Sequence, residues 1–398
     1  MDGAIEIHIK ESITGYFAFT SGAIICKIEK WENEHIRKAR KKMIEKLQSQ
    51  VCQLNQDAMK AAKEHWDRIG KPIEGLGLLE DLVIKIAGIQ GSEQVDIDKK
   101  AVVVMCSDNV VVEEGVTQTD KEVTAIVTEN FGKGIASVNV MAQMAGAYVF
   151  PVDIGVARDI TQEGILNKKV AYGTKNMKKG PAMTKEQALR AIQTGFELVN
   201  VLKEEGFTII GTGEMGIGNT TTSSAIISVL LDLPVEEVTG PGAGLSKDGV
   251  QHKIEVIKEA VQLNQPKRDD PIDVISKVGG LDIAGLTGVF LGGAIFGVPI
   301  VIDGVISLAA ALLAKTIDEN AVNYMIPSHL GKEPASQLAM KELGLEPIIH
   351  GNLALGEGTG TTLLFPMLDL AMAVYNQNKT FSDIKVEAYH KFEEESSC

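Results

Sequence analysis

Short apolar runs rich in β-branched residues alternate with longer amphipathic stretches along most of this chain. The apolar runs lie at 101–105, 148–154, 207–210, 298–302 and 323–326. Hydrophobic residues recur with a helical period at roughly 133–146, 184–205, 219–231, 247–263, 305–318 and 334–343. Strands that alternate with helices predict βαβ units. We therefore expect an α/β fold with a doubly wound, mostly parallel, Rossmann-like sheet.

Both ends of the chain have a different pattern. Residues 31–68 are charged and helical in period, a Gly/Pro turn at 70–77 follows, and a second helix runs to Ile89. A last helix is expected near 361–377. We predict an N-terminal extension of unknown role (1–30), an α/β core (92–350), and a smaller helical domain built from 31–91 and from 351–398, which also holds the catalytic loop.

Two apolar stretches could belong to a membrane span or an export signal. Residues 12–26 lack a basic leader and a clean cleavage site, which disfavours a signal peptide. Residues 279–314 are interrupted by Asp282, Pro299 and Asp303, so they predict a buried helix–strand–helix unit. We expect no membrane association.

The net charge and the cysteine content limit the classes of partner and the kinds of cysteine site that we expect. The net charge of −14 disfavours nucleic acid and anionic membranes as partners. Cys26, Cys52, Cys106 and Cys398 are scattered without paired spacing, which indicates reduced thiols in a cytoplasmic protein and neither a disulfide framework nor a zinc site.

The first glycine-rich motif, GTGEMGIGNTTTSSA, occupies 211–225. Gly211, Gly213 and Gly216 match the G-x-G-x-x-G pattern of dinucleotide sites, which leaves a nicotinamide-dependent oxidoreductase as an alternative. Glu214 argues against it, because a carboxylate in this loop would repel a pyrophosphate. Asn219 and Thr220 are typical of a helix N-cap and first turn. The plainer interpretation is a strand-to-helix turn with a solvated glutamate.

The second motif, TGPGAGLS at 239–246, precedes a helix that carries Lys253. Successive small residues allow backbone N–H groups to form an anion-binding nest, and a lysine in the next helix adds positive charge. The alternative for Lys253 is an ordinary exposed lysine.

The third motif, GEGTGTTLLFPMLD at 356–369, places Glu357 between two glycines. Apolar neighbours would raise the pKa of its carboxyl group toward the range of a general base. The alternative is a loop glutamate that caps the following helix. Glu214 and Glu357 together resemble a paired-carboxylate site, although the sequence does not show that they meet.

Two weaker signals follow predicted strands. Asp108 and Asn109 come after 101–105, while His329 and Glu333 come after 323–326. No ligand spacing typical of a metal site is present, so we expect no metal and interpret His329 as a hydrogen-bonded loop histidine.

Several long motifs, taken in order, resemble one known family. They are KPIEGLGLLE (71–80), AGIQG (87–91), GPAMT (180–184), GEMGIGNTT, GPGAGL, DVISKVGGLDIAGLTGV (273–289), PSHLGKEPA and GEGTGTTL. This set, spanning about 65 to 377, is similar to nicotinate-nucleotide:dimethylbenzimidazole phosphoribosyltransferases. The resemblance implies transfer of phosphoribose from nicotinate mononucleotide to a cobamide lower-ligand base, with no cofactor, by a protein that is usually a homodimer.

The same resemblance implies residue roles. Glu357 would be the catalytic base, and Glu214 an acidic residue near the ribose. Gly216, Asn219, Thr220, Gly242 and Lys253 would bind the phosphate and ribose of the mononucleotide, while Asp108, Asn109 and Thr117 would lie in the acceptor-base pocket. No metal is needed, because the pyridinium of the donor is already a good leaving group.

One departure from the family pattern falls in the acceptor region. The family usually has Asp-His-Gly where this chain has Asp108-Asn109-Val110. The resemblance implies dimethylbenzimidazole or a related base as acceptor. Because of this departure, our hypothesis is that the acceptor differs from dimethylbenzimidazole and is another benzimidazole, a purine or a phenolic compound. A further alternative is a weakly catalytic subunit that forms a heterodimer with a paralogue.

Overall fold

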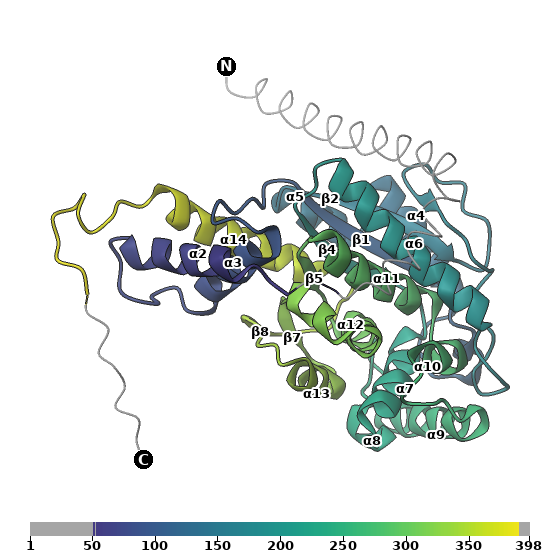
Figure 1. Cartoon of the computed structure of the whole chain (residues 1–398). Helices are drawn as coiled ribbons and strands as arrows, with labels where there is room; N and C mark the ends of the chain where they lie inside the picture. The colour runs from purple at the N-terminus through teal and green to yellow at the C-terminus, as the bar shows by residue number, and fades with distance from the viewer. Residues whose placement is uncertain (1–50, 52, 390–398) are drawn as a thin grey trace, which may run out of the picture.

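Six parallel strands form the central sheet of the computed structural model, which describes residues 51 and 53–389 (Figure 1). Their order is β3-β2-β1-β4-β5-β6. The strands are β1 (Lys100–Ser107), β2 (Ala147–Gly155), β3 (Leu166–Asn167), β4 (Ile209–Met215), β5 (Ile300–Ile302) and β6 (Met325–Pro327). The predicted α/β fold with a parallel sheet is confirmed. The strand order reverses between β1 and β4, and ligands of such sheets bind beyond the carboxyl ends of the strands at this point.

The helices that follow the strands agree largely with the hydrophobic pattern. They are α4 (Glu122–Lys133), α5 (Ser137–Met144), α6 (Lys185–Glu204), α7 (Asn219–Leu231), α8 (Val235–Val238), α9 (Lys247–Asn264), α10 (Pro271–Val278), α11 (Leu281–Phe296), α12 (Val305–Ile317) and α13 (Pro334–Leu343), with short 3-10 turns η1 (Val110–Glu114) and η2 (Glu319–Tyr324). A separate parallel pair, β7 (His329–Gly331) and β8 (Ile349–Leu353), lies beside α13 (Figure 1).

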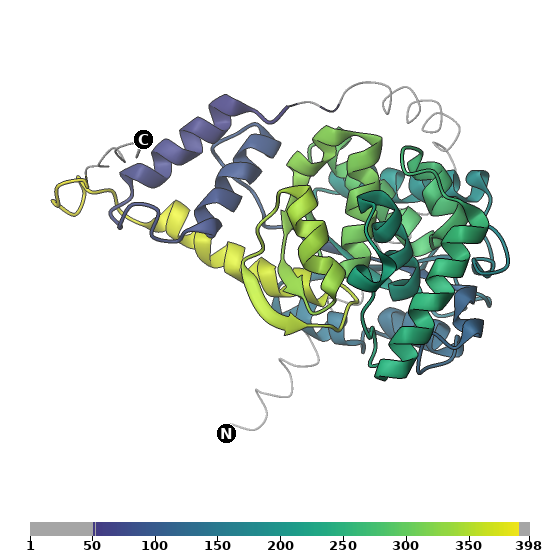
Figure 2. The same ribbon diagram turned by 90° about the horizontal axis from the view of Figure 1, so that it is seen from below.

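Three helices from the two ends of the described chain lie together to one side of the sheet (Figures 1 and 2). They are α2 (Gln56–Arg68), α3 (Leu78–Gln90) and α14 (Thr359–Gln377). The buried Trp66 ring contacts Tyr375 edge to face, with 4.9 Å between centroids. The predicted domain limits at 91 and 351 stay predictions, and residues 1–30 and 31–50 lie outside the described residues.

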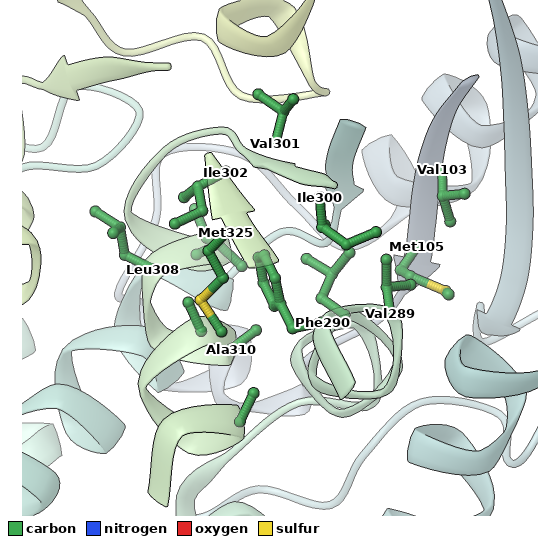
Figure 3. Packing of buried hydrophobic residues seen from close by; sticks show 14 of the residues in the cluster. Val103, Met105, Val289, Phe290, Ile300, Val301, Ile302, Leu308, Ala310 and Met325 are labelled. Carbon is green, nitrogen blue, oxygen red and sulfur yellow. The ribbon is translucent and has the colours of Figure 1, made fainter. Parts of the chain in front are cut away.

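Glycines bring α6 and α11 into close contact beneath the sheet. A Cβ on Gly195 would lie 1.9 Å from the Gly285 carbonyl oxygen, and one on Gly288 would lie 1.8 Å from the Ile192 carbonyl oxygen. Phe290 of α11 packs beside Ile300 and Met325 (Figure 3). This interior position explains why α11 is apolar on all sides.

The predicted helix–strand–helix unit at 279–314 is confirmed as α11, β5 and α12. Among the described residues, no helix is long and apolar enough to cross a membrane.

Several predicted elements differ from the structure. The helix at 133–146 is α5 alone, and α4, which precedes it, was missed. The short strand β3 and the largely exposed β8 were also missed, because neither shows a run of buried apolar residues. The strand expected at 207–210 begins later and runs to Met215, so Glu214 lies on a strand and not in a loop.

Candidate active site

The glycines of the first motif allow the chain around Glu357 to approach strand β4 closely. A Cβ on Gly213 would lie 2.5 Å from the Glu357 carbonyl oxygen, and one on Gly211 would lie 1.9 Å from Thr361 Cγ2. These two glycines are therefore required for packing between β4 and the start of α14. Their spacing matches a dinucleotide fingerprint. Their Cα atoms, however, face the segment from Glu357 to Thr361 and not a nucleotide.

Glu214 is buried on β4, with 8% of its surface exposed, so the interpretation as a solvated glutamate is wrong. Its carboxylate accepts a hydrogen bond from Asn219 Nδ2, which also donates to Asp282 Oδ2 at 3.0 Å. Burial raises the pKa of Glu214 to about 8, and the negative charges of Asp282, Asp303 and Glu357 act in the same direction.

Asp282, in the first turn of α11, was not predicted as a site residue. It is fully buried, and burial raises its pKa to about 6, although the hydrogen bond from Asn219 acts to lower it. Its Oδ1 atom and Asn109 Oδ1 are buried without a hydrogen-bond partner. Both oxygens lie close to Gly280, since a Cβ there would be 2.2 Å from the first and 2.4 Å from the second. The signal in the sequence was an aspartate within an apolar run, which needs a partner when buried.

Glu357 has a left-handed backbone with φ of 62°, between Gly356 at 84° and Gly358 at 93°. This conformation is strained for a residue with a side chain, and such strain is often found at functional sites. Glu357 Oε2 accepts a hydrogen bond of 3.3 Å from Val138 N at the start of α5. Burial raises the pKa of Glu357, the Val138 bond lowers it, and the charge of Asp303 raises it further.

The segments that carry Glu214 and Glu357 are in contact. A Cβ on Gly356 would lie 2.5 Å from Glu214 Oε1, so the Glu214 carboxylate lies against the residue before Glu357. The structure thus brings the segments of the two motifs into contact, and the charge of Glu357 acts on the Glu214 carboxyl group.

Asp303, directly after β5, holds the loop that carries Glu357 through two hydrogen bonds. Its Oδ2 accepts from Gly358 N at 3.1 Å and its Oδ1 from Gly360 N at 2.7 Å. His329 lies beside it and opposes the effect of burial on the pKa of Asp303. His329 also forms a 3.0 Å hydrogen bond with Ser328 Oγ, so the predicted hydrogen-bonded histidine is confirmed, but it begins strand β7 and does not lie in a loop. Asp303 was missed because its partners lie more than fifty residues away in the sequence.

Lys253 is completely buried, so the exposed-lysine interpretation is wrong. Its Nζ donates to Thr220 Oγ1 at 2.9 Å and to the Gly240 carbonyl at 3.3 Å. Burial lowers its pKa to about 8. In the same loop, Gly242 N donates to Glu333 Oε1 at 2.9 Å. Lys253, Thr220 and Gly242 therefore form one cluster.

A small cavity of about 70 Å³ lies between the first two motifs. Four predicted site residues line it, namely Thr117, Gly216, Asn219 and Thr220, together with Val116, Gln118, Thr119, Ile217, Gly218, Pro241, Ala243 and Leu245. Asp108 and Asn109 are buried outside this lining; Asp108 Oδ2 accepts from Ala157 N at 2.7 Å. Burial raises the pKa of Asp108, whose Oδ1 has no hydrogen-bond partner.

Cys106 is a buried free thiol on β1, and Cys26, Cys52 and Cys398 lie outside the described residues. Across residues 51 and 53–389, no group of three or more His, Cys, Asp or Glu side chains is arranged to hold a metal ion.

Comparison with known proteins decides the family. A family model described as phosphoribosyltransferase matches residues 51–386. The nicotinate-nucleotide–dimethylbenzimidazole phosphoribosyltransferase of Clostridium acetobutylicum is 49% identical over 346 residues, covering 87% of this chain and 98% of the relative. The chain belongs to this family. Its namesake from Acetivibrio thermocellus is 47% identical over 339 residues, covering 85% of this chain and 97% of that relative.

Solved structures of the family share the fold. The crystal structure of CobT from Thermus thermophilus superposes with a TM-score of 0.79 at 35% identity, covering 84% of this chain and all of that one. A second structure from the same organism, titled as the nicotinate-nucleotide–dimethylbenzimidazole phosphoribosyltransferase, gives 0.78 at 36% identity, covering 83% and 98%. The oxidoreductase alternative has no support among these relatives. The roles assigned to individual residues stay predictions.

Proposed function

We propose that the chain transfers the phosphoribosyl group of nicotinate mononucleotide to 5,6-dimethylbenzimidazole or a related acceptor base, giving nicotinate and an α-riboside 5′-phosphate for the nucleotide loop of cobalamin or another cobamide. Its relatives carry this activity in their names. The observation that carries the proposal is the contact of the Glu214 carboxylate with Gly356, next to Glu357, at the carboxyl end of β4.

In this reaction the bond from the ribose C1′ to the pyridinium nitrogen breaks, and its electrons return to the ring as neutral nicotinate pyridine. A ring nitrogen of the acceptor attacks C1′ from the opposite face, which inverts the anomeric centre. Glu357 takes the proton from the other acceptor nitrogen, and its raised pKa makes it a stronger base than an exposed glutamate. The positive charge of the bound donor favours ionisation of Glu214, whose carboxylate then stabilises the positive charge that develops on the ribose.

The donor phosphate would be held by Lys253 and Thr220, beside the cavity lined by Gly216 and Asn219. The start of α7 at Asn219 faces this region, and the N-terminus of a helix favours an anion. Lys253 uses two of its three N–H donors on Thr220 and Gly240, which leaves one for the phosphate.

The first test follows nicotinate release and riboside phosphate formation from nicotinate mononucleotide and dimethylbenzimidazole. We expect Glu357→Gln to lose most of the activity, whereas Glu346→Gln, at an exposed glutamate, keeps it. If the wild type releases no nicotinate with any acceptor, the catalytic function is wrong and a binding or partner-dependent subunit is the better interpretation.

Acceptor choice is tested separately by competition. Thr117 lines the cavity, while the buried Asn109, in the place where the family usually has histidine, lies close to Asp282. Dimethylbenzimidazole competes with another benzimidazole, a purine and a phenol in one assay. Overwhelming preference for dimethylbenzimidazole would contradict our hypothesis of an altered acceptor.

We also propose that the chain acts as a cytoplasmic homodimer through an apolar surface on α5 and α14. Met144 (85% exposed) and Val140 on α5 and Leu370 (70%) and Leu363 on α14 are exposed on helices that contact each other. Light scattering coupled to size-exclusion chromatography should give twice the mass of one chain for the wild type. The Met144→Lys variant should give a lower mass. A monomer in both samples would contradict the homodimer and leave the heterodimer with a paralogue.

A further inference from the structure

The carboxylate of Glu333 lies directly against the loop that carries Gly240 and Gly242. Its Oε1 accepts from Gly242 N at 2.9 Å. A Cβ on Gly240 would lie 2.3 Å from Glu333 Oε2 and 2.7 Å from Pro334 Cδ. The turn before α13 is thus packed against this loop so closely that only glycine fits at 240.

Glu333 also acts on the buried lysine of the same cluster. Lys253 is completely buried and donates to the carbonyl of Gly240, the residue that the Glu333 carboxylate touches. Its pKa is lowered to about 8 by burial, and the charge of Glu333 is what opposes this effect. A buried ammonium needs a nearby negative charge to stay protonated.

Glu333 contacts the loop without lining the donor cavity. Pro241, Ala243 and Thr220 line the 70 Å³ cavity, and Glu333 does not. It lines a separate cavity of about 250 Å³ instead, together with Leu330, Gly331, Lys332, Pro334, Gln337, His350 and Asn352. The carboxylate therefore holds the loop without occupying the cavity in which the donor would bind.

We propose that Glu333 is a positioning residue for the donor phosphate: it fixes the Gly240–Gly242 backbone and keeps the buried Lys253 ammonium charged. This inference rests on the proposed function, in which that cluster binds the 5′-phosphate of nicotinate mononucleotide. The Glu333 side chain then has two effects: it accepts a hydrogen bond from Gly242 N, and it places a negative charge near Lys253.

Two variants separate these effects. Glu333→Gln keeps an acceptor for Gly242 N but removes the charge, whereas Glu333→Ala removes both. KM for nicotinate mononucleotide and kcat are measured from pH 6 to pH 9.5, with Glu346→Gln as the control. The dissociation constant of inorganic phosphate is measured by calorimetry over the same range.

For Glu333→Gln we expect a KM close to wild type at pH 6 and roughly fivefold higher at pH 8, because without the Glu333 charge its Lys253 loses its proton at a lower pH. Glu333→Ala should raise KM at every pH. The kcat of both variants should stay within about twofold of wild type, because neither change touches the reacting atoms. The dissociation constant of phosphate should follow KM.

A lower KM or tighter phosphate binding in Glu333→Gln would overturn the proposal, since it would mean that the carboxylate competes with the phosphate. An unchanged pH profile would overturn it too. If the wild type binds phosphate but releases no nicotinate, the proposed function fails while the phosphate measurements still decide the role of Glu333. If the wild type binds neither phosphate nor mononucleotide, both fail.

Discussion

Replacing Glu214 by glutamine should stabilise the folded protein at high pH while abolishing most of its activity. Glu214 is buried, and its pKa is raised from 4.5 to about 8. The folded state therefore binds a proton more tightly than the unfolded state between these two values. Stability then falls as pH rises through this window, the reverse of an ion-paired carboxylate.

The magnitude follows from the size of the shift. Each pKa unit corresponds to ~1.4 kcal/mol, so ionising Glu214 in the folded state costs up to ~5 kcal/mol above pH 8. Glutamine retains an acceptor for Asn219 Nδ2 and carries no charge. We expect a gain in the free energy of unfolding of ~0–1 kcal/mol at pH 5 and ~2–5 kcal/mol at pH 9, the lower value applying if water enters the site.

Urea unfolding of wild type, Glu214→Gln and the control Glu346→Gln at pH 5, 7 and 9 measures this difference. The control should show no trend with pH. A Glu214→Gln difference that is the same at all three pH values would refute the reasoning, because the cost of burial would then not depend on ionisation. Loss of stability at every pH would show instead that the carboxylate is structural.

Three further predictions concern the phosphate cluster, the catalytic loop and the core. Lys253→Met should raise KM for nicotinate mononucleotide roughly 10- to 100-fold, and wild-type KM should rise above pH 8, where the ammonium loses its proton. Asp303→Asn should lower kcat about tenfold or more and move the acid limb of the kcat profile to lower pH, because the pKa of Glu357 then falls. Gly288→Ala should lower the free energy of unfolding by ~3 kcal/mol or more, measured in urea, because its Cβ would meet the Ile192 carbonyl at 1.8 Å.

Each of these has a contrary result. A KM independent of pH between 7 and 9.5 would contradict the role of Lys253. An acid limb that stays in place in Asp303→Asn would mean that the aspartate does not act on Glu357 through its charge. A fully stable Gly288→Ala would mean that α6 and α11 separate easily.

Much of the fold was predictable because its buried strands and amphipathic helices have clear periods. The exceptions have physical reasons. β8 is largely exposed, so it has no apolar alternation, and β3 has only two residues. The true extent of β4 was hidden because Gly211 and Gly213 are typical of loops, and only the contact with the Glu357 segment explains them.

The candidate site was predictable where a motif carries it and not where distant residues complete it. Glu214 and Glu357 stand in glycine-rich motifs, which drew attention to them. Asp303 and Asp282 lie in an apolar run, where their partners could not be identified from the sequence. Lys253 has the appearance of a surface lysine on an amphipathic helix, and its complete burial depends on the loop at 239–246.

Four carboxyl groups lie close together in the site, and the repulsion between their negative charges lowers the stability of the folded protein. Glu214, Asp282, Asp303 and Glu357 gather at one edge of the sheet, and each has a raised pKa. The hydrogen bonds described above that hold these four carboxyl groups come from neutral amide groups, so none of them neutralises the negative charge. A donor with a pyridinium ring brings positive charge into this site, and that charge moves to the ribose as the ring departs. The repulsion among the carboxylates is therefore relieved when the donor binds, and the charge stays among these groups as it moves to the ribose, so the site stabilises the transition state relative to the free protein.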